Sequence, residues 1–241
     1  MDAHRDIALI TGASRGIGAA CAEAFARAGY DLALLARTAS ALTEVVGRCE
    51  AHGVRALAIP VDVRDEAAVA EAVARCVADL GGLSVVINNA GIYAKGSAET
   101  LEPEVFARVM DVNVNGLMHV TRHALPHLVA AGGGAVIQVS SVAGRSSFAG
   151  GAAYCASKHA VMGYSEAVFE DVREAGVKVT VICPGFVNTE MVAGRGLIAE
   201  RMIQPADIAA AALFVARFPT TGCPTEIVIR PQRTPYGSDP S

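Results

Sequence analysis

A glycine-rich turn close to the N-terminus constrains the fold of this chain more than any other feature. Residues 6–10 are mostly apolar and predict a short buried strand, and residues 19–28 are strong helix formers that end at Gly29. Between them lies Thr-Gly-Ala-Ser-Arg-Gly-Ile-Gly, residues 11–18. A strand, a glycine turn and a helix in this order are typical of a dinucleotide-binding unit. The spacing G-x-x-x-G-x-G is a variant of the more common G-x-G-x-x-G, and a plain glycine turn is the alternative for this segment taken alone.

Strands and helices alternate along the rest of the chain. Short apolar runs predict further strands at residues 31–36, 54–61, 83–87, 135–139, 177–183 and 226–229. Helix-favouring stretches lie between them, at residues 40–52, 65–80, 103–128, 152–175 and 205–217. The helix at 103–128 is expected to be kinked or interrupted near Pro126. The alternation predicts an α/β fold, a doubly wound, Rossmann-like parallel sheet of about seven strands with helices on both faces.

The composition is that of a single domain. The chain has 241 residues, 52% hydrophobic and 18% charged, so residues 1–241 are expected to bury roughly 70–75% of their unfolded surface around one core. The net charge is −4 and no basic tract appears, which argues against a nucleic acid as partner. The polar N-terminus and the lack of an apolar run of ~20 residues argue against a signal peptide and a membrane span, so a cytoplasmic location is expected. The 6 cysteines form no Cys-x-x-Cys pair, which indicates buried thiols.

Tyr154 and Lys158 are the residues that point most directly to chemistry. On a helix, positions i and i+4 share one face, so the phenol and the ammonium can approach each other. A free tyrosine has a pKa of about 10, and a lysine cation beside it stabilises the phenolate and lowers that pKa. The pair then works as a general acid/base at neutral pH. Taken alone, the same spacing also fits an amphipathic pair at a helix surface.

Five motifs stand at or near the predicted strand ends. They are the glycine turn, Asn88-Asn89-Ala90-Gly91, Ser140-Ser141, Tyr154 with Lys158, and Pro184-Gly185. In the order and spacing of these motifs the chain resembles the short-chain dehydrogenase/reductase family, in its compact single-domain branch. The resemblance covers residues 6–230 and implies an oxidoreductase that interconverts a carbonyl and an alcohol by hydride transfer.

The resemblance also implies roles for four catalytic residues. Tyr154 would protonate the carbonyl oxygen, or accept the proton in the reverse direction. Lys158 would lower the pKa of Tyr154 and bind the nicotinamide ribose. Ser141, rather than Ser140, would hydrogen-bond the substrate oxygen. Asn113 matches the asparagine that holds a water linking the lysine to solvent.

Other positions match the cofactor contacts of that family. They are Gly12, Ser14, Arg15, Gly16, Ile17, Gly18, Arg37, Asp62, Val63, Asn89, Ala90, Gly91, Tyr154, Lys158, Pro184, Gly185, Val187 and Thr189. Among them, Asp62 is expected at the adenine, and Asn89 and Gly91 beside the ribose. Val187 and Thr189 are expected at the nicotinamide carboxamide.

Charge indicates which nicotinamide cofactor is used. An NAD site expects a carboxylate about 20 residues after the glycines, on the ribose 2′-hydroxyl. Here the second predicted strand ends without one, and Arg37 follows it directly. Arg15 lies inside the glycine turn. Two guanidinium groups suit a 2′-phosphate, which they bind in a bidentate manner, so NADP(H) is the predicted cofactor.

Two further patterns have simple interpretations. His119, His123 and His127 are spaced like a metal-binding stripe, but no carboxylate accompanies them and no metal is expected. The small residues at 150–153 and Ala156 allow close helix contact. In the resembled family such helices pair between subunits, which implies a homotetramer or homodimer.

The sequence leaves the substrate open. Residues 186–204 match the family's substrate segment and read as a short, glycine-punctuated lid. Arg195 and Arg201 in this segment either bind a carboxylate or phosphate or face solvent. The chain ends in Glu-Ile-Val-Ile-Arg-Pro, residues 226–231, and a polar tail at 231–241, where many 3-oxoacyl reductases have a Val-Asp-Gly-Gly turn.

The predicted function is an NADPH-dependent oxidoreductase for a small-molecule carbonyl or alcohol, with no nucleic-acid or membrane partner. A 3-oxoacyl reductase of fatty-acid or polyketide type is one alternative. A redox sensor that binds NADP without turnover is another, although such proteins tend to lose the catalytic residues. A sugar-nucleotide epimerase or dehydratase would carry an extra C-terminal region and a differently spaced glycine motif.

Overall fold

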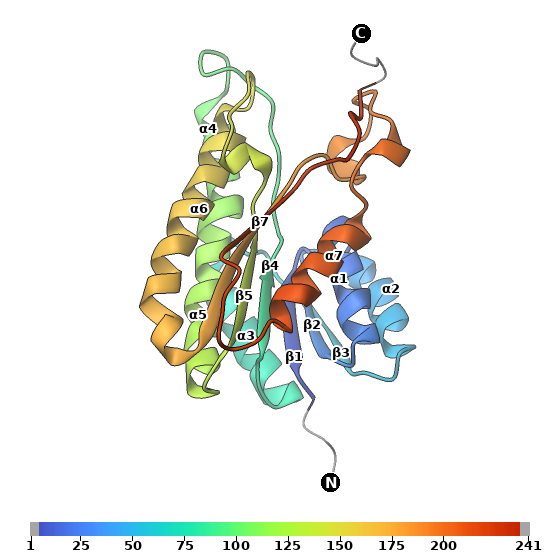
Figure 1. The fold of residues 1–241 in the computed structure, drawn as a ribbon, viewed down its shortest axis with the longest axis vertical. Helices are drawn as coiled ribbons and strands as arrows, with labels where there is room; N and C mark the ends of the chain where they lie inside the picture. The colour runs from blue at the N-terminus through green and yellow to red at the C-terminus, as the bar shows by residue number, and fades with distance from the viewer. Residues whose placement is uncertain (1–4, 237–241) are drawn as a thin grey trace.

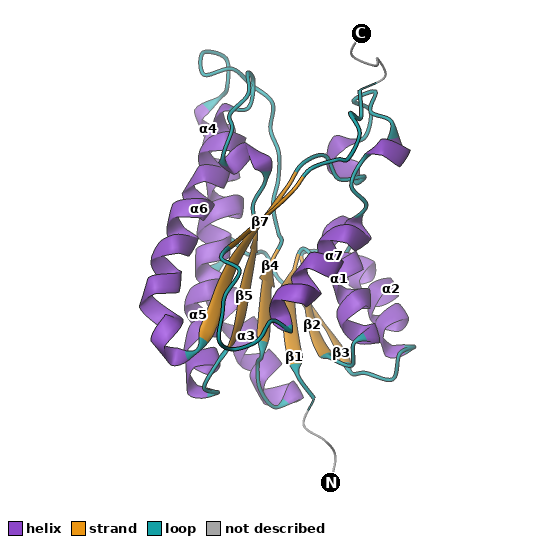
Figure 2. Ribbon diagram, viewed as in Figure 1, coloured by secondary structure: helices purple, strands orange, loops and turns teal. Residues whose placement is uncertain are grey.

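The protein is a parallel sheet between two layers of helices (Figures 1 and 2). The computed structural model describes residues 5–236, and within them seven strands pair in the order β3-β2-β1-β4-β5-β6-β7, all parallel. The strands are β1 (Ile7–Thr11), β2 (Asp31–Ala36), β3 (Ala56–Pro60), β4 (Val85–Asn88), β5 (Gly134–Val139), β6 (Val177–Pro184) and β7 (Glu226–Ile229). This confirms the predicted Rossmann-like fold.

Helices cover both faces of the sheet. They are α1 (Gly16–Arg27), α2 (Ala39–Glu50), α3 (Glu66–Leu80), α4 (Pro103–Met110), α5 (Gly116–Ala130), α6 (Ala152–Val172) and α7 (Pro205–Ala216). Helices α1, α2 and α7 form one layer, and α3, α5 and α6 form the other, with α4 packed on α6 (Figure 1). Asp65, the first residue of the stretch predicted as helix at 65–80, caps α3, since its carboxylate accepts from the Ala68 N–H at 3.1 Å.

The strands are apolar throughout because both of their faces are buried. In β1, Ala8 and Ile10 pack under α1 and α7, whereas Ile7 and Leu9 pack on the opposite side with residues of α3 and α5. All four are at most 1% exposed. Side chains alternate across a strand, so a sheet covered on both faces needs an unbroken apolar run.

The helix predicted at residues 103–128 is interrupted at a different place than expected. The interruption is a π-helical segment, η1 (Asp111–Asn115), between α4 and α5, and Pro126 lies inside α5 without breaking it. Pro126 and Arg122, four residues before it, are both exposed, so the carbonyl that loses its helical partner lies on the outer face of the helix. The prediction of a break near Pro126 was therefore wrong.

The chain after β7 returns to the segment at residues 186–204. The Ile198 N–H donates to the Pro235 carbonyl at 2.9 Å, and the Tyr236 ring packs on Phe186 with 5.7 Å between centroids. Residues 237–241 of the predicted polar tail lie outside the described residues. Within residues 5–236, no helix combines the length and the apolar character needed to cross a membrane.

Candidate active site

The glycine turn between β1 and α1 brings stretches of backbone closer together than side chains would allow. Gly12 and Gly16 have φ values of 63° and 56°, in the left-handed region that residues with a Cβ rarely adopt. A Cβ on Gly18 would lie only 2.2 Å from the Gly12 carbonyl oxygen. The turn thus leaves bare backbone at the N-terminus of α1, where unpaired N–H groups suit the phosphates of a dinucleotide.

Hydrogen bonds from the end of β4 hold this turn in place. Asn89 Nδ2 donates to the carbonyls of Thr11 at 3.0 Å and Gly12 at 3.2 Å. The Thr11 hydroxyl in turn accepts from the N–H groups of Asn89 and Ala90, each at 3.0 Å. The Asn89 side chain is therefore used to fix the turn, and its contact with a ribose stays a prediction.

Tyr154 and Ser141 meet at the carboxyl ends of the strands. Ser141 follows β5, and its hydroxyl accepts from the Ala143 N–H at 3.1 Å. Tyr154 lies in the first turn of α6. Burial raises the pKa of the Tyr154 phenol above its ordinary value, while a hydrogen bond with Ser141 and the charge of Arg195 act in the opposite direction. The phenol is therefore protonated at neutral pH, as a general acid must be.

Lys158 is buried one helical turn after Tyr154. Its side chain Nζ donates to the Val139 carbonyl at 2.8 Å and lies 5.7 Å from the centre of the Tyr154 ring. Burial lowers the pKa of this lysine to about 8. Ser141 and Arg195 are among the groups that lower the pKa of Tyr154. The lowering of that pKa by Lys158 stays a prediction.

Asn113 projects from the π-helical segment into the interior. Its Oδ1 accepts from the Ile92 N–H at 2.8 Å, and its Nδ2 donates to the Ile92 carbonyl and the Ser157 hydroxyl, both at 3.0 Å. The amide therefore ties η1 to α6 and to the loop after β4. Gly91, in that loop, passes close to Lys158, since a Cβ there would lie 3.7 Å from Nζ. The predicted water at Asn113 stays a prediction.

Charged side chains gather beyond the ends of β2 and β3, where the adenosine half of a cofactor is predicted. The Asp62 carboxylate accepts from Arg64, with 2.6 Å between Oδ2 and Nη2. The pKa of Asp62 is lowered mainly by the hydrogen bond from Arg64, and the nearby charge of Arg37 contributes as well. Arg37 itself is exposed and forms no ion pair within residues 5–236. It remains available to a phosphate.

Arg15, the second arginine predicted at the 2′-phosphate, has a protein partner. Its Nε lies 2.8 Å from Oε2 of Glu190, in the short helical turn η4 (Glu190–Val192). The two side chains are 71% and 63% exposed. The ion pair joins the glycine turn to the lid predicted at residues 186–204, and a phosphate would have to compete with it.

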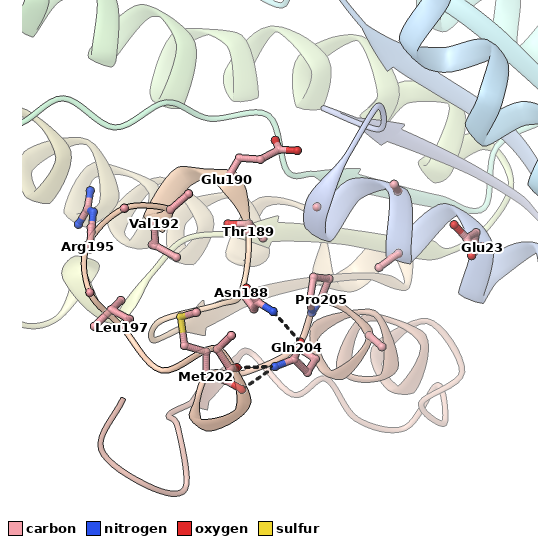
Figure 3. A pocket seen from close by; sticks show the side chains of 18 of the residues that line it. Glu23, Asn188, Thr189, Glu190, Val192, Arg195, Leu197, Met202, Gln204 and Pro205 are labelled. Carbon is pink, nitrogen blue, oxygen red and sulfur yellow. Dashed lines mark hydrogen bonds between the residues drawn. The ribbon is translucent and has the colours of Figure 1, made fainter. Parts of the chain in front are cut away.

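The lid lines an open cavity of about 850 Å³ together with α1 and the start of α7 (Figure 3). Gln204 organises its base by donating to the carbonyls of Ala199 at 3.1 Å and Met202 at 3.0 Å. Asn188 Nδ2 donates to the Gln204 side chain at 3.2 Å. Thr189 lies at the turn itself, because a Cβ on Gly16 would be 3.2 Å from its Cγ2. The cavity therefore opens directly beside the glycine turn.

Most predicted cofactor residues thus lie around the carboxyl ends of the strands, as the fold requires. Among the rest, the Gly185 N–H donates to the Ile229 carbonyl at 2.7 Å, Pro184 ends β6, and Val187 is buried. The residues available fit a nicotinamide dinucleotide: bare backbone for the pyrophosphate, a cation for a 2′-phosphate, and a tyrosine–lysine pair at the other end.

Sequence reasoning missed three residues of the site. Tyr93 packs edge-on against Tyr154 with 5.3 Å between ring centroids. Arg64 forms an ion pair with Asp62, and Glu190 forms one with Arg15. Only Arg64 had a local signal, since it follows Asp62 by two positions. Within residues 5–236 no three histidine, cysteine or acidic side chains are grouped to hold a metal, and His119 instead contacts the Val63 carbonyl at 3.0 Å.

Comparison with known proteins agrees with this geometry. The sequence profile described as short chain dehydrogenase matches residues 6–197. Oxidoreductase UcpA of Salmonella typhimurium is 36% identical over 185 residues, which cover 76% of this chain and 70% of that protein.

Solved structures share the fold and differ in the cofactor they contain. A metagenomic short-chain oxidoreductase in complex with NADP superposes with a TM-score of 0.84 at 30% identity, covering 95% of this chain and 98% of that one. Carveol dehydrogenase from Mycobacterium avium in complex with NAD has a TM-score of 0.88 at 24% identity, covering 93% and 95%. The fold alone therefore does not determine which of the two cofactors is bound.

Proposed function

This chain belongs to the short-chain dehydrogenase family, and we propose that it is an NADPH-dependent oxidoreductase that interconverts a carbonyl and an alcohol on a small molecule. One observation carries the proposal. Tyr154, which lies close enough to Ser141 for that residue to lower its pKa, and the buried Lys158 stand at the same edge of the sheet as the glycine turn. The loop after β4 links the two: Asn89 hydrogen-bonds to the glycine turn, and Gly91 passes close to Lys158.

When bound, the cofactor supplies the hydride that the carbonyl carbon accepts. Tyr154 donates its phenolic proton to the carbonyl oxygen, so the product is a neutral alcohol. Ser141 hydrogen-bonds the same oxygen and keeps the phenol aligned. Lys158 brings a positive charge near the phenolate that remains. In the oxidising direction Tyr154 must start as the phenolate, so oxidation is favoured at alkaline pH.

The support for NADPH over NADH is the charge at the end of β2. Arg37 is exposed there, without an ion pair in the described part of the chain, and the Asp62 carboxylate is already bound by Arg64. A guanidinium in this position attracts a 2′-phosphate and leaves a 2′-hydroxyl without a carboxylate partner.

Removing this charge should weaken NADPH selectively. We expect Arg37→Ala to lower kcat/KM for NADPH by roughly 10- to 100-fold, the size of a charged hydrogen bond, with NADH little changed. Arg75→Ala, which removes an exposed arginine of α3 paired with Asp79, is the matched control. Steady-state kinetics with both cofactors decide the point, and a wild-type preference for NADH would refute the assignment.

The Arg15–Glu190 ion pair gives a second test of whether this site binds the 2′-phosphate of NADPH. A 2′-phosphate has to draw Arg15 away from Glu190, so Glu190→Gln is expected to tighten NADPH binding up to about fivefold, because exposed ion pairs contribute at most ~1 kcal/mol. NADH affinity should stay constant. Fluorescence titration of both cofactors measures the effect, and an equal change for both would show that Arg15 does not bind the phosphate.

The two alternatives give different results in a substrate screen. A redox sensor would bind NADPH and consume none with aldehydes, β-keto esters, quinones or hydroxy acids. A 3-oxoacyl reductase would strongly prefer β-ketoacyl thioesters over simple carbonyls. The proposed enzyme consumes NADPH with at least one class of small carbonyl.

A further inference from the structure

Arg195 contacts the Tyr93 ring, which in turn contacts Tyr154. Its guanidinium carbon lies over the Tyr93 ring, 4.3 Å from the centroid. Tyr93 in turn packs edge-on against Tyr154, with 5.3 Å between centroids and 72° between the ring planes. These contacts place the guanidinium within about 10 Å of the Tyr154 ring, on the order of one Debye length. A charged group therefore stands near the proposed acid, and the Tyr93 ring contacts both.

The charge of Arg195 is not neutralised by the protein. Within residues 5–236 it forms no ion pair: of the two acidic residues of the lid, Glu190 is paired with Arg15, and Glu200 forms no ion pair with Arg195. Figure 3 shows the Glu190 side chain directed toward α1 and Arg195 on the far side of the lid. Contact with an aromatic face uses no N–H donor, so the fork of the guanidinium remains available to an acceptor.

Arg195 and the Tyr154 phenol also interact electrostatically. The positive charge of Arg195 is one of the groups that lower the pKa of Tyr154. The described residues therefore present, in one region, a proton donor, two aromatic rings and an unpaired cation.

We infer that Arg195 binds a carboxylate on the substrate, so that the enzyme acts on an oxo acid and the corresponding hydroxy acid. The inference rests on the proposed function, which supplies the carbonyl that faces Tyr154. The planar guanidinium matches a carboxylate in a bidentate manner. Tyr93 positions the guanidinium and lines the space between the two polar ends of the substrate. Arg195 is thus a residue that determines specificity and takes no part in proton transfer.

A matched pair of aldehydes tests this assignment. 4-Formylbenzoate and 4-formylbenzamide have the same ring and the same carbonyl, and they differ in charge at the opposite end. The wild-type protein with NADPH is expected to have a kcat/KM roughly 10- to 100-fold higher for the carboxylate. Arg195→Ala should abolish this preference by slowing the carboxylate alone, and Arg195→Lys should restore part of it.

Arg201→Ala is the control for charge in the lid. It removes one cation from the same segment, whereas the guanidinium stacked on Tyr93 is that of Arg195, so it should leave the preference intact. Equal kcat/KM values for the two aldehydes in the wild type, or an equal loss for both in Arg195→Ala, would overturn the inference. Turnover of the amide by the wild type would still uphold the proposed function.

A binding measurement separates the inference from catalysis. Benzoate and benzamide are titrated into the protein, with and without NADPH, by saturation-transfer NMR. The wild type should bind benzoate at least about tenfold more tightly, and Arg195→Ala should bind the two equally. If neither aldehyde is reduced but benzoate is still preferred through Arg195, the proposed function fails and the anion site stands. Equal binding of both probes by the wild type contradicts the anion site.

Discussion

Replacing Tyr154 by phenylalanine is expected to reduce kcat for carbonyl reduction by roughly 10³-fold, within the range of general-acid catalysis. The substitution removes one hydroxyl and keeps the ring that packs on Tyr93. Ser141 remains able to bind the carbonyl oxygen, but no proton is delivered to it. Because Tyr154 is also among the predicted cofactor contacts, the affinity for NADPH should fall by no more than about tenfold, the size of one neutral hydrogen bond. Stopped-flow measurement of NADPH consumption, with a parallel binding titration, checks both statements.

Tyr164→Phe is the matched control. Tyr164 lies on the same helix, and the neighbour that lowers its pKa is Thr121 on α5, where Tyr154 has Ser141. It loses the same hydroxyl, so it reports any general effect of the substitution on α6. Retention of wild-type kcat in Tyr154→Phe, with cofactor bound, would show that another group supplies the proton.

Lys158→Met is expected to lower kcat by at least about 10²-fold and yet raise the free energy of unfolding at neutral pH. The folded protein holds a buried ammonium whose pKa is lowered by burial to about 8 from an ordinary 10.5. That difference corresponds to a penalty of about 3 kcal/mol when the lysine is charged in both states. Loss of the charged hydrogen bond to the Val139 carbonyl lowers the free energy of unfolding by about 1.5–3 kcal/mol. The net gain at pH 7 is then at most about 1.5 kcal/mol.

The pH dependence of this gain identifies its cause. Between pH 8 and 10.5 the unfolded chain binds more protons at Lys158 than the folded protein does, so the penalty disappears as the pH rises. The variant should be more stable than the wild type below pH 8 and slightly less stable above pH 10.5. Buried thiols such as Cys21, with a pKa raised to about 12, titrate in both proteins and cancel in the difference. Urea unfolding across this range tests the crossing, and a pH-independent difference would exclude burial of the charge as its origin.

Much of the fold could be predicted because its signals are local. The apolar run of β1 reflects burial on both faces, with Ile7 and Leu9 on one side and Ala8 and Ile10 on the other. Strand β2 has the predicted bounds, and Asp65 caps α3 through a contact three residues away. Such patterns need no knowledge of distant parts of the chain.

The π-helical segment could not be predicted, because distant contacts create it. Asn113 is held by Ile92 and Ser157, and Gly116 packs so closely on Val63 that a Cβ would lie 2.5 Å from its Cγ2. Pro126 was the strongest local signal for a break, but its outward position makes it tolerable.

In the candidate site, too, the residues within local motifs could be predicted and the contacts between distant segments could not. Ser141, Tyr154 and Lys158 follow from motif spacing at strand ends, and the structure brings them to one edge of the sheet. The pairing of Arg15 with Glu190 and the stacking of Arg195 on Tyr93 depend on how the lid folds back over the body. No spacing in the sequence encodes those contacts.

The most direct test of the proposed function follows the hydride itself. The wild-type protein is mixed with NADPH deuterated at the transferable position and with 4-formylbenzoate or 4-formylbenzamide, and the product is analysed by mass spectrometry. The proposal predicts one deuterium on the carbinol carbon of the alcohol and one alcohol formed for each NADPH consumed, with the rate lost in Tyr154→Phe. Binding of NADPH without formation of alcohol, from these aldehydes or any class in the substrate screen, would contradict it.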